Sequence, residues 1–177
     1  MLTLNMKLIK DFLPKDLIDF LHTHYLKVPH FYGHTSNFVA HDDPYLTERP
    51  EISFYKHHFH IDEAMTNYLC RKVKDPFFKE IPFEQLGFLR IYINVHHPGM
   101  DGAFHEDDGD ETIMLMVSET LPDSGCFEYK DNDKIKQIPF VQNTLIAFDA
   151  KTPHRGRAPK RGARVTLAFK TEKKKIG

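Results

Sequence analysis

Three side chains that suit a transition metal stand in the second half of the chain. His105 and Asp107 are two residues apart, and His154 follows much later. Side chains two apart on an extended segment project to the same side, so His105 and Asp107 can bind one ion together. Two imidazoles and one carboxylate on a single face of an octahedron are typical of non-haem iron(II), and they leave three positions for other ligands. The pattern therefore predicts an iron site able to hold a small cosubstrate together with dioxygen.

A cation is predicted on the strand that follows the distal histidine. Arg164 comes ten residues after His154, beyond a turn at Lys160-Arg161-Gly162. A guanidinium binds a carboxylate through two parallel hydrogen bonds, a geometry that an ammonium group does not offer. We therefore expect Arg164 to anchor the far carboxylate of a cosubstrate whose other end lies on the metal.

The His-x-Asp spacing alone is weak evidence, because chance predicts roughly one such pair in a chain of this composition. Three occur, at His41/Asp43, His60/Asp62 and His105/Asp107. The first lies in an irregular stretch and the second at the expected start of a helix. Only the third is followed by a histidine across several expected strands and then by a cation ten residues further on. Context thus selects His105 and Asp107.

The elements that must position these residues are expected to be strands. From Phe83 onward, short β-favouring runs alternate with turn residues, as in an all-β sandwich or barrel. The expected strands are Gly87 to Val95, Glu111 to Ser118, Gly125 to Tyr129, Ile135 to Pro139, Asn143 to Phe148, His154 to Arg157 and Arg164 to Lys170.

Two helices are expected before the strands. One covers Leu13 to Leu21, entered through a proline, with Leu17, Phe20 and Leu21 on the face that packs on a sheet. The other covers Ile61 to Val73, where apolar residues recur every four positions. The segment His30 to Pro50 lacks periodicity, and we expect an irregular segment that folds over a pocket.

Length and composition limit the number of domains, the kinds of partner and the location of the protein. A chain of 177 residues fits one domain, residues 1–177, with helical and irregular support in 1–82, a β core in 83–170 and a basic tail in 171–177. The formal net charge of −1 gives no general attraction for nucleic acid. Two cysteines, the absence of a signal-peptide pattern and the absence of a long apolar run predict a cytoplasmic protein that makes no membrane contact.

The residues from about Leu89 to Lys170 resemble the iron(II)- and 2-oxoglutarate-dependent dioxygenases, specifically their prolyl 4-hydroxylase-like branch. The likeness rests on His105-Glu106-Asp107, His154 and Arg164, with Tyr92 and the Pro98-Gly99 turn ahead of them. It implies a double-stranded β-helix, or jelly roll, packed against N-terminal helices. It also implies that His105, Asp107 and His154 hold iron(II) and that Arg164 binds 2-oxoglutarate.

The resemblance further implies the reaction. Such enzymes use dioxygen to convert 2-oxoglutarate into succinate and carbon dioxide while they hydroxylate an unactivated C–H bond, with ascorbate as a further reductant. Tyr92 and Thr166 are expected to contact the cosubstrate, although a strand tyrosine or threonine is more often only part of the packing. The substrate that the branch implies is a peptidyl proline.

Two other functions remain open. The same iron chemistry in another pocket would hydroxylate a free amino acid or another small metabolite. A jelly roll could instead be a non-enzymatic module that binds a metal or ligand, a function for which Arg164 would have no use. The sequence leaves the oligomeric state undetermined.

The sequence gives only weak indications of a function for the remaining polar residues. Arg155 and Arg157 either position a substrate or lie solvated on a rim strand. His57, His58 and His60 suggest a second metal site without supplying further ligands. The basic run from Lys170 to Lys175 is expected to be a solvated, frayed end.

Overall fold

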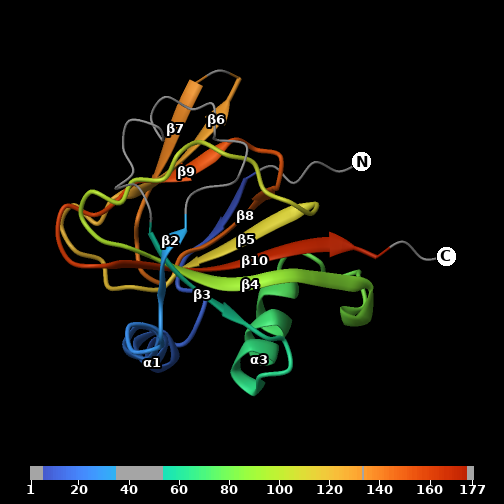
Figure 1. Cartoon of the computed structure of the whole chain (residues 1–177). Helices are drawn as coiled ribbons and strands as arrows, with labels where there is room; N and C mark the ends of the chain where they lie inside the picture. Colours follow the sequence, from blue (N-terminus) through green and yellow to red (C-terminus); the bar gives the residue numbers. More distant parts are fainter. Residues whose placement is uncertain (1–5, 35–53, 133, 175–177) are drawn as a thin grey trace.

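The computed structural model describes residues 6–34, 54–132 and 134–174, which form two antiparallel sheets and two longer helices. In Figure 1 the smaller sheet lies on one side of the larger sheet, and the helices lie on the other. Residues 35–50 of the segment His30 to Pro50, expected to be irregular, fall outside the described residues, whereas Phe31–His34 form a strand. No helix in the described ranges is long and apolar enough to cross a membrane.

The larger sheet has seven strands in the order β1-β8-β5-β10-β4-β3-β2. Its strands are β1 (Lys7–Ile9), β2 (Phe31–His34), β3 (Phe54–Phe59), β4 (Leu86–His96), β5 (Glu111–Met116), β8 (Leu145–Asp149) and β10 (Arg164–Lys173). The long strand β10 lies between β4 and β5. The last strand in sequence therefore pairs in the middle of the sheet, where both of its faces are covered.

The two faces of the larger sheet differ in chemistry. Side chains alternate along β10 and β4, and the paired residues share a face. One face presents apolar pairs such as Val165 with Val95 and Leu167 with Ile93, which belong to the main hydrophobic core. The other face presents polar pairs, Arg164 with His96 and Lys170 with Arg90. Apolar burial thus stabilises one side, and the other side is available for chemistry.

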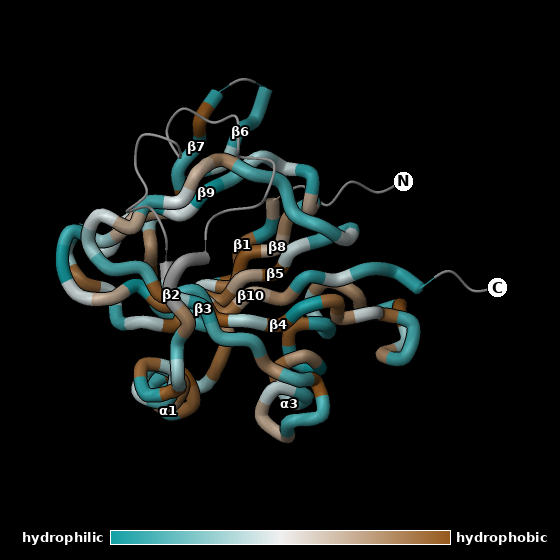
Figure 2. The backbone as a smooth tube through the Cα atoms, in the orientation of Figure 1, coloured by the Kyte–Doolittle hydropathy of each residue, from teal (hydrophilic) through white to brown (hydrophobic). Residues whose placement is uncertain are grey.

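Two helices pack on the apolar face: α1 (Lys15–Tyr25) and α3 (Ala64–Lys74). The buried side chains of α1 are Ile18, Leu21 and Tyr25. Packing against the sheet confirms the expected role of both helices. Phe20 was wrongly assigned to the buried face, because it is 52 % exposed and stacks on His24. Figure 2 shows the hydrophobic residues of the helices and of the central strands gathered between them.

The smaller sheet faces the polar side of the larger one. It contains β7 (Lys134–Pro139), β6 (Cys126–Asp131) and β9 (His154–Gly156), in that order. A second apolar cluster, which includes Phe127, Phe148 and Met116, fills part of the space between the sheets. Two antiparallel sheets packed in this way form the predicted jelly roll, with helices on its outer side.

Several boundaries differ from the sequence predictions. Segments before Phe83 contribute three strands to the larger sheet, where only helical and irregular structure was expected. At the other end, β10 continues to Lys173. Lys170, interpreted as part of a solvated end, is 2 % exposed and points into the molecule. A lone lysine at the end of an apolar strand gives no sequence signal of a buried partner.

Candidate functional site

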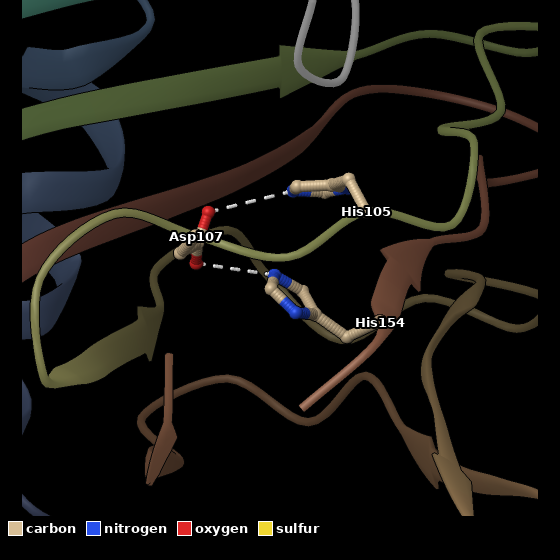
Figure 3. A group of neighbouring side chains, drawn as sticks. All are labelled: His105, Asp107 and His154. Carbon is tan, nitrogen blue, oxygen red and sulfur yellow. Dashed lines mark ion pairs between the residues drawn. The ribbon is translucent and has the colours of Figure 1, made fainter. Parts of the chain in front are cut away.

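His105, Asp107 and His154 meet between the two sheets. The Nε2 atom of His105 lies 3.6 Å from Oδ1 of Asp107, and the Nε2 atom of His154 lies 3.3 Å from Oδ2. One ligand atom from each residue lies within 4.8 Å of the others. Figure 3 shows both imidazoles pointing toward the carboxylate. The predicted convergence of these three residues is therefore present in the fold.

Backbone pairing brings the two histidines together. His105 and His154 form an isolated antiparallel bridge, in which each N–H donates to the carbonyl of the other residue at 3.0 and 2.9 Å. The Asp107 N–H donates to the carbonyl of Ala150 at 2.7 Å, which fixes the next part of the segment. Two stretches far apart in sequence thus run side by side, and their side chains project into one space.

Hydrogen bonds orient both rings for metal binding. His105 Nδ1 lies 2.9 Å from the carbonyl of Ala103, and His154 Nδ1 lies 2.8 Å from the carbonyl of Thr152. A carbonyl oxygen only accepts, so Nδ1 carries the proton in each neutral ring. Nε2 then keeps its lone pair and faces Asp107. A hydrogen bond from the other ring nitrogen that fixes the tautomer is the usual arrangement at metal-binding histidines.

Burial keeps these rings neutral. Burial, and then the neighbouring His154, lower the pKa of His105 to about 3. Burial likewise lowers the pKa of His154 to about 4, against the backbone bond to Thr152. The Phe148 ring lies 4.7 Å from the ring of His154 and contributes to this apolar surrounding. Neutral imidazoles at physiological pH are the form that binds a metal.

Asp107 has further partners that sequence reasoning did not identify. Thr112 donates from Oγ1 to Oδ2 of Asp107 at 2.7 Å, and the buried ammonium of Lys170 pairs with the same oxygen. Lys170 also lies 3.2 Å from Thr112 Oγ1. The carboxylate is thus held from the side of the larger sheet through Oδ2. The spacing of six residues places Lys170 and Arg164 on one face of β10, but nothing in the sequence identifies Asp107 as the partner of Lys170.

Arg164 begins β10 and is buried, 4 % exposed, on the polar face. Its Nη1 donates to the backbone carbonyls of Cys126, at 2.9 Å, and Arg157. Burial lowers the pKa of Arg164 to about 10, so the guanidinium keeps its charge near pH 7. The predicted inward direction of this side chain is present.

The guanidinium also has a donor to spare. Arg164 Nε is buried and has no hydrogen-bond partner among the described residues. A buried N–H without an acceptor is unfavourable, and a bound carboxylate would satisfy it. The charge and the unpaired donor of Arg164 therefore suit a carboxylate group of a bound cosubstrate.

The two other predicted cosubstrate contacts lie on the same polar face. Thr166 is two residues from Arg164 on β10 and is 4 % exposed. Tyr92 is 5 % exposed and pairs across the sheet with Ala168, which places it toward the Lys170 end. Contact of either side chain with a cosubstrate stays a prediction.

Asn94 and His96 also lie on the polar face. The sequence left open whether His96 is a loop residue without a role, a partner of a metal ligand or a substrate contact, and it gave no indication for Asn94. His96 is the last residue of β4, is 4 % exposed and pairs in register with Arg164. Its Nδ1 lies 2.6 Å from the Met100 carbonyl. Asn94 pairs with Thr166, and its Oδ1 is buried without a partner among the described residues. The alternation that places Tyr92 inward, extended along β4, would have identified both.

Arg155 and Arg157 serve other contacts. The Arg155 Nε donates to Glu128 at 2.6 Å across the smaller sheet, and its guanidinium lies 4.4 Å from the Phe104 ring centroid. Successive residues of β9 point to opposite faces, so Arg155 points away from the space that holds His154. Arg157 lies 3.5 Å from Asp101 and lines a pocket of about 530 Å³. The Arg155 contacts fit a role in tying the smaller sheet together.

No second metal group accompanies the other histidines within residues 6–34, 54–132 and 134–174. There, His105, Asp107 and His154 are the one group of three ligand-type residues close enough to hold an ion. His57 and His58 lie on β3, and His57 Nδ1 bonds the Pro29 carbonyl at 2.7 Å. Local bonding therefore accounts for His57.

Comparison with known proteins gives structural matches alone. No protein-family model matches the sequence, and no curated protein matches it. A prolyl 4-hydroxylase from Pseudomonas putida superposes with a TM-score of 0.71 at 15 % identity, over 96 % of this chain and 93 % of that one. A prolyl hydroxylase from Trichoplax adhaerens, in complex with a hypoxia-inducible factor peptide, gives 0.70 at 12 % identity, over 95 % and 83 %.

A third similar solved structure contains a metal, 2-oxoglutarate and a small molecule. HygX from Streptomyces hygroscopicus, with nickel, 2-oxoglutarate and hygromycin B bound, gives a TM-score of 0.70 at 10 % identity, over 97 % of this chain and 84 % of that one. These proteins differ in what they bind, yet all match this chain along most of its length. The chain therefore has the jelly-roll fold that prolyl hydroxylases share with other 2-oxoglutarate and iron(II) oxygenases.

Proposed function

We propose that the protein is an iron(II)- and 2-oxoglutarate-dependent dioxygenase. The observation that carries the proposal is the meeting of His105, Asp107 and His154 between the sheets, together with the buried guanidinium of Arg164. A purely structural metal would need the three ligands but not the arginine. The non-enzymatic alternative is therefore the weaker one.

Each residue has a defined task in this proposal. His105, His154 and Asp107 would hold iron(II), which supplies dioxygen activation when bound. The Ala103 and Thr152 carbonyls keep both imidazoles in the tautomer that presents Nε2. Arg164 would orient 2-oxoglutarate through its far carboxylate, and the surrounding apolar side chains, such as Phe127 and Phe148, exclude water. Succinate and carbon dioxide would be the products formed from the cosubstrate, with ascorbate as a further reductant.

For the substrate we propose a peptidyl proline, with a small molecule as the alternative. The similar Trichoplax adhaerens prolyl hydroxylase is seen with a peptide, and this supports the first. HygX is seen with hygromycin B, and this supports the second. We also propose a cytoplasmic location, which the free thiols of Cys70 and Cys126 support.

The test measures cosubstrate turnover and binding together. Succinate release with iron(II), 2-oxoglutarate and ascorbate should occur in the native protein and fall at least about a hundredfold in His105→Ala. Arg164→Ala should bind metal normally and weaken 2-oxoglutarate binding at least about tenfold. The matched control is Arg161→Ala, which removes an exposed arginine of the same segment. Unchanged 2-oxoglutarate affinity in both Arg164→Ala and His105→Ala would refute the proposal.

A further inference from the structure

The peptide group between Arg157 and Ala158 joins a loop carboxylate to the guanidinium of Arg164. Its carbonyl, that of Arg157, accepts a hydrogen bond from Arg164 Nη1. Its N–H, that of Ala158, donates to Oδ1 of Asp101 at 2.7 Å. In a trans peptide unit the carbonyl and the N–H point in opposite directions. Asp101 and Arg164 therefore lie on opposite sides of one peptide group and bond to its two ends.

The charges on both sides of this peptide group strengthen the two bonds. The negative end of the peptide dipole meets the guanidinium, and the positive end meets the carboxylate. Hydrogen bonds linked in this way polarise one another, and bonds to charged groups are stronger than bonds between neutral ones. Burial lowers the pKa of Arg164 to about 10, whereas Cys126 and Asp101 act to raise it. The negative charge of Asp101 thus favours the charged guanidinium.

The preceding peptide group is held from the same two sides. Gly102, next to Asp101, donates its N–H to the Gly156 carbonyl at 2.8 Å. On the opposite side, the Arg157 N–H donates to the Cys126 carbonyl at 2.8 Å. The loop before the metal ligands therefore fixes two successive peptide groups at the end of β9. The bond to Asp101 is the one that sets the direction of the Arg157 carbonyl.

We infer that Asp101 positions the Arg164 guanidinium for a carboxylate of the cosubstrate, acting through the peptide group between Arg157 and Ala158. This inference rests on the proposed function and adds a residue outside the metal ligands and the cosubstrate contacts. Asp101 fixes the carbonyl that accepts from Nη1, so the other donors of the guanidinium, Nε among them, keep one direction. A donor held in place before binding loses less freedom when the carboxylate arrives.

Variants at position 101 separate this role from a general tie between the loop and β9. Asp101→Ala should weaken binding of 2-oxoglutarate to the full chain loaded with Zn(II) about fivefold to tenfold, and should change Zn(II) affinity by about twofold at most. Asp101→Asn keeps an oxygen that accepts from the Ala158 N–H and should lose only about twofold. Calorimetric titration of both ligands measures these constants.

Three results of these titrations would overturn the inference. One is an unchanged 2-oxoglutarate affinity in Asp101→Ala. Another is a loss in Asp101→Asn as large as the loss in Asp101→Ala. The third is an equal loss of Zn(II) and 2-oxoglutarate affinity in Asp101→Ala, which would mean that the whole site is disturbed.

Asp110→Ala is the matched control. Asp110 also accepts from a backbone N–H, that of Lys173 at 2.9 Å, but has no part in the peptide group at Arg164. Its replacement should change 2-oxoglutarate affinity by about twofold at most, and equal weakening in both alanine variants would refute the role of Asp101. The Asp101 side chain is 17 % exposed and lines a surface pocket, so alanine there leaves no void in the core.

The Nε–H resonance of the Arg164 side chain distinguishes this inference from the proposed function. Without any ligand, Asp101→Ala should shift this resonance and speed its exchange with solvent at least about threefold, and Asp110→Ala should not. If the native protein binds no 2-oxoglutarate, the proposed function fails, and the resonance still tests the position of the guanidinium. An unaltered resonance in Asp101→Ala overturns the role of Asp101 and leaves the oxygenase proposal standing.

Discussion

Asp107 Oδ2 has three neighbours, because Thr112 and Lys170 bond it and His154 Nε2 lies 3.3 Å away. Oδ1 has only His105 Nε2 nearby, at 3.6 Å, among the contacts found in the described ranges. The carboxylate is therefore better fixed on one oxygen than on the other. A metal can therefore bind Oδ1 more easily than Oδ2. We expect Asp107 to coordinate the metal through this one oxygen.

The low pKa values of the two imidazoles predict metal binding that hardly depends on pH. Their values of about 3 and about 4 leave His105 and His154 neutral throughout pH 6 to 8. Co(II) affinity, followed by visible absorption, should change by about twofold at most across this range. Two histidines with ordinary pKa values would lose roughly fifteenfold on going from pH 8 to pH 6. A loss of that size would contradict the burial of both rings.

Arg164→Lys tests geometry at constant charge. A lysine keeps the cation but cannot donate to the Cys126 and Arg157 carbonyls and to a carboxylate in one planar arrangement. We expect 2-oxoglutarate binding to weaken about tenfold to a hundredfold, with Co(II) affinity unchanged. Calorimetric titration of both ligands measures this, with Arg161→Lys as the control. Unaltered binding of 2-oxoglutarate would show that a positive charge at position 164 is enough to bind it.

The convergence of His105, Asp107 and His154 and the inward direction of Arg164 were predictable, because their signal lies in residue type and spacing. The sequence did not predict Lys170 or Thr112, whose importance depends on which strands are neighbours. Lys170 meets Asp107 only because β10 pairs with β5 in the sheet interior. Such cross-strand contacts are set by register, which a single sequence does not reveal.

At the scale of elements, the backbone of β9 passes close to the side chain of Arg164, the first residue of β10. A Cβ atom at Gly156 would meet the Arg164 guanidinium directly, so the strand approaches Arg164 only because this residue lacks a side chain. Gly156→Ala should displace the guanidinium and weaken 2-oxoglutarate binding about tenfold while metal binding is retained. Gly87→Ala, in β4, is the control, since its Cβ would meet mainly the flexible Glu172 side chain. Equal cosubstrate affinity in both variants would show that the guanidinium is easily relocated.

Asn143 joins the N-terminal segment to the turn before β8. Its side chain accepts from the Leu13 N–H at 2.9 Å and donates to the Leu13 carbonyl at 2.7 Å, and its φ is 63°. Asn143→Ala should lower the free energy of unfolding by about 2–4 kcal/mol, because two buried bonds are lost and alanine tolerates positive φ poorly.

Urea denaturation checks the Asn143 prediction. Asn132→Ala is the control, because Asn132 also has a positive φ, 48°, but is exposed. Its cost should be smaller by the contribution of the two bonds to Leu13. A similar loss in both variants would show that backbone conformation alone accounts for the effect.

Element positions from β4 onward were largely predictable, because alternation and turn residues lie close together there. The expected strand Glu111 to Ser118 corresponds to β5, and Arg164 to Lys170 corresponds to most of β10. β3 was missed because its run Phe54-Tyr55-Lys56-His57-His58-Phe59 has no clear alternation, and its pairing with β4 comes from the rest of the fold.

For the whole molecule, metal binding should couple to stability. The three proposed ligands come from two segments, His105 to Asp107 and the segment of His154, which are far apart in sequence and adjacent only in the native fold. At a Co(II) concentration about a hundredfold above the dissociation constant, binding should add about 2.7 kcal/mol, which raises the melting temperature by roughly 5–10 °C. Differential scanning calorimetry measures the shift, and His105→Ala should abolish it. A shift retained in that variant would place the ion elsewhere.

The division of the larger sheet into an apolar and a polar face has a consequence for evolution and for engineering. The helix-covered face carries the main hydrophobic core, whereas the opposite face carries the polar residues that a ligand would meet. Alternate positions along one strand are thus under different constraints. Replacements among the polar residues of the opposite face should therefore cost the fold less than replacements on the apolar face, so that new specificities can arise on a backbone that stays constant.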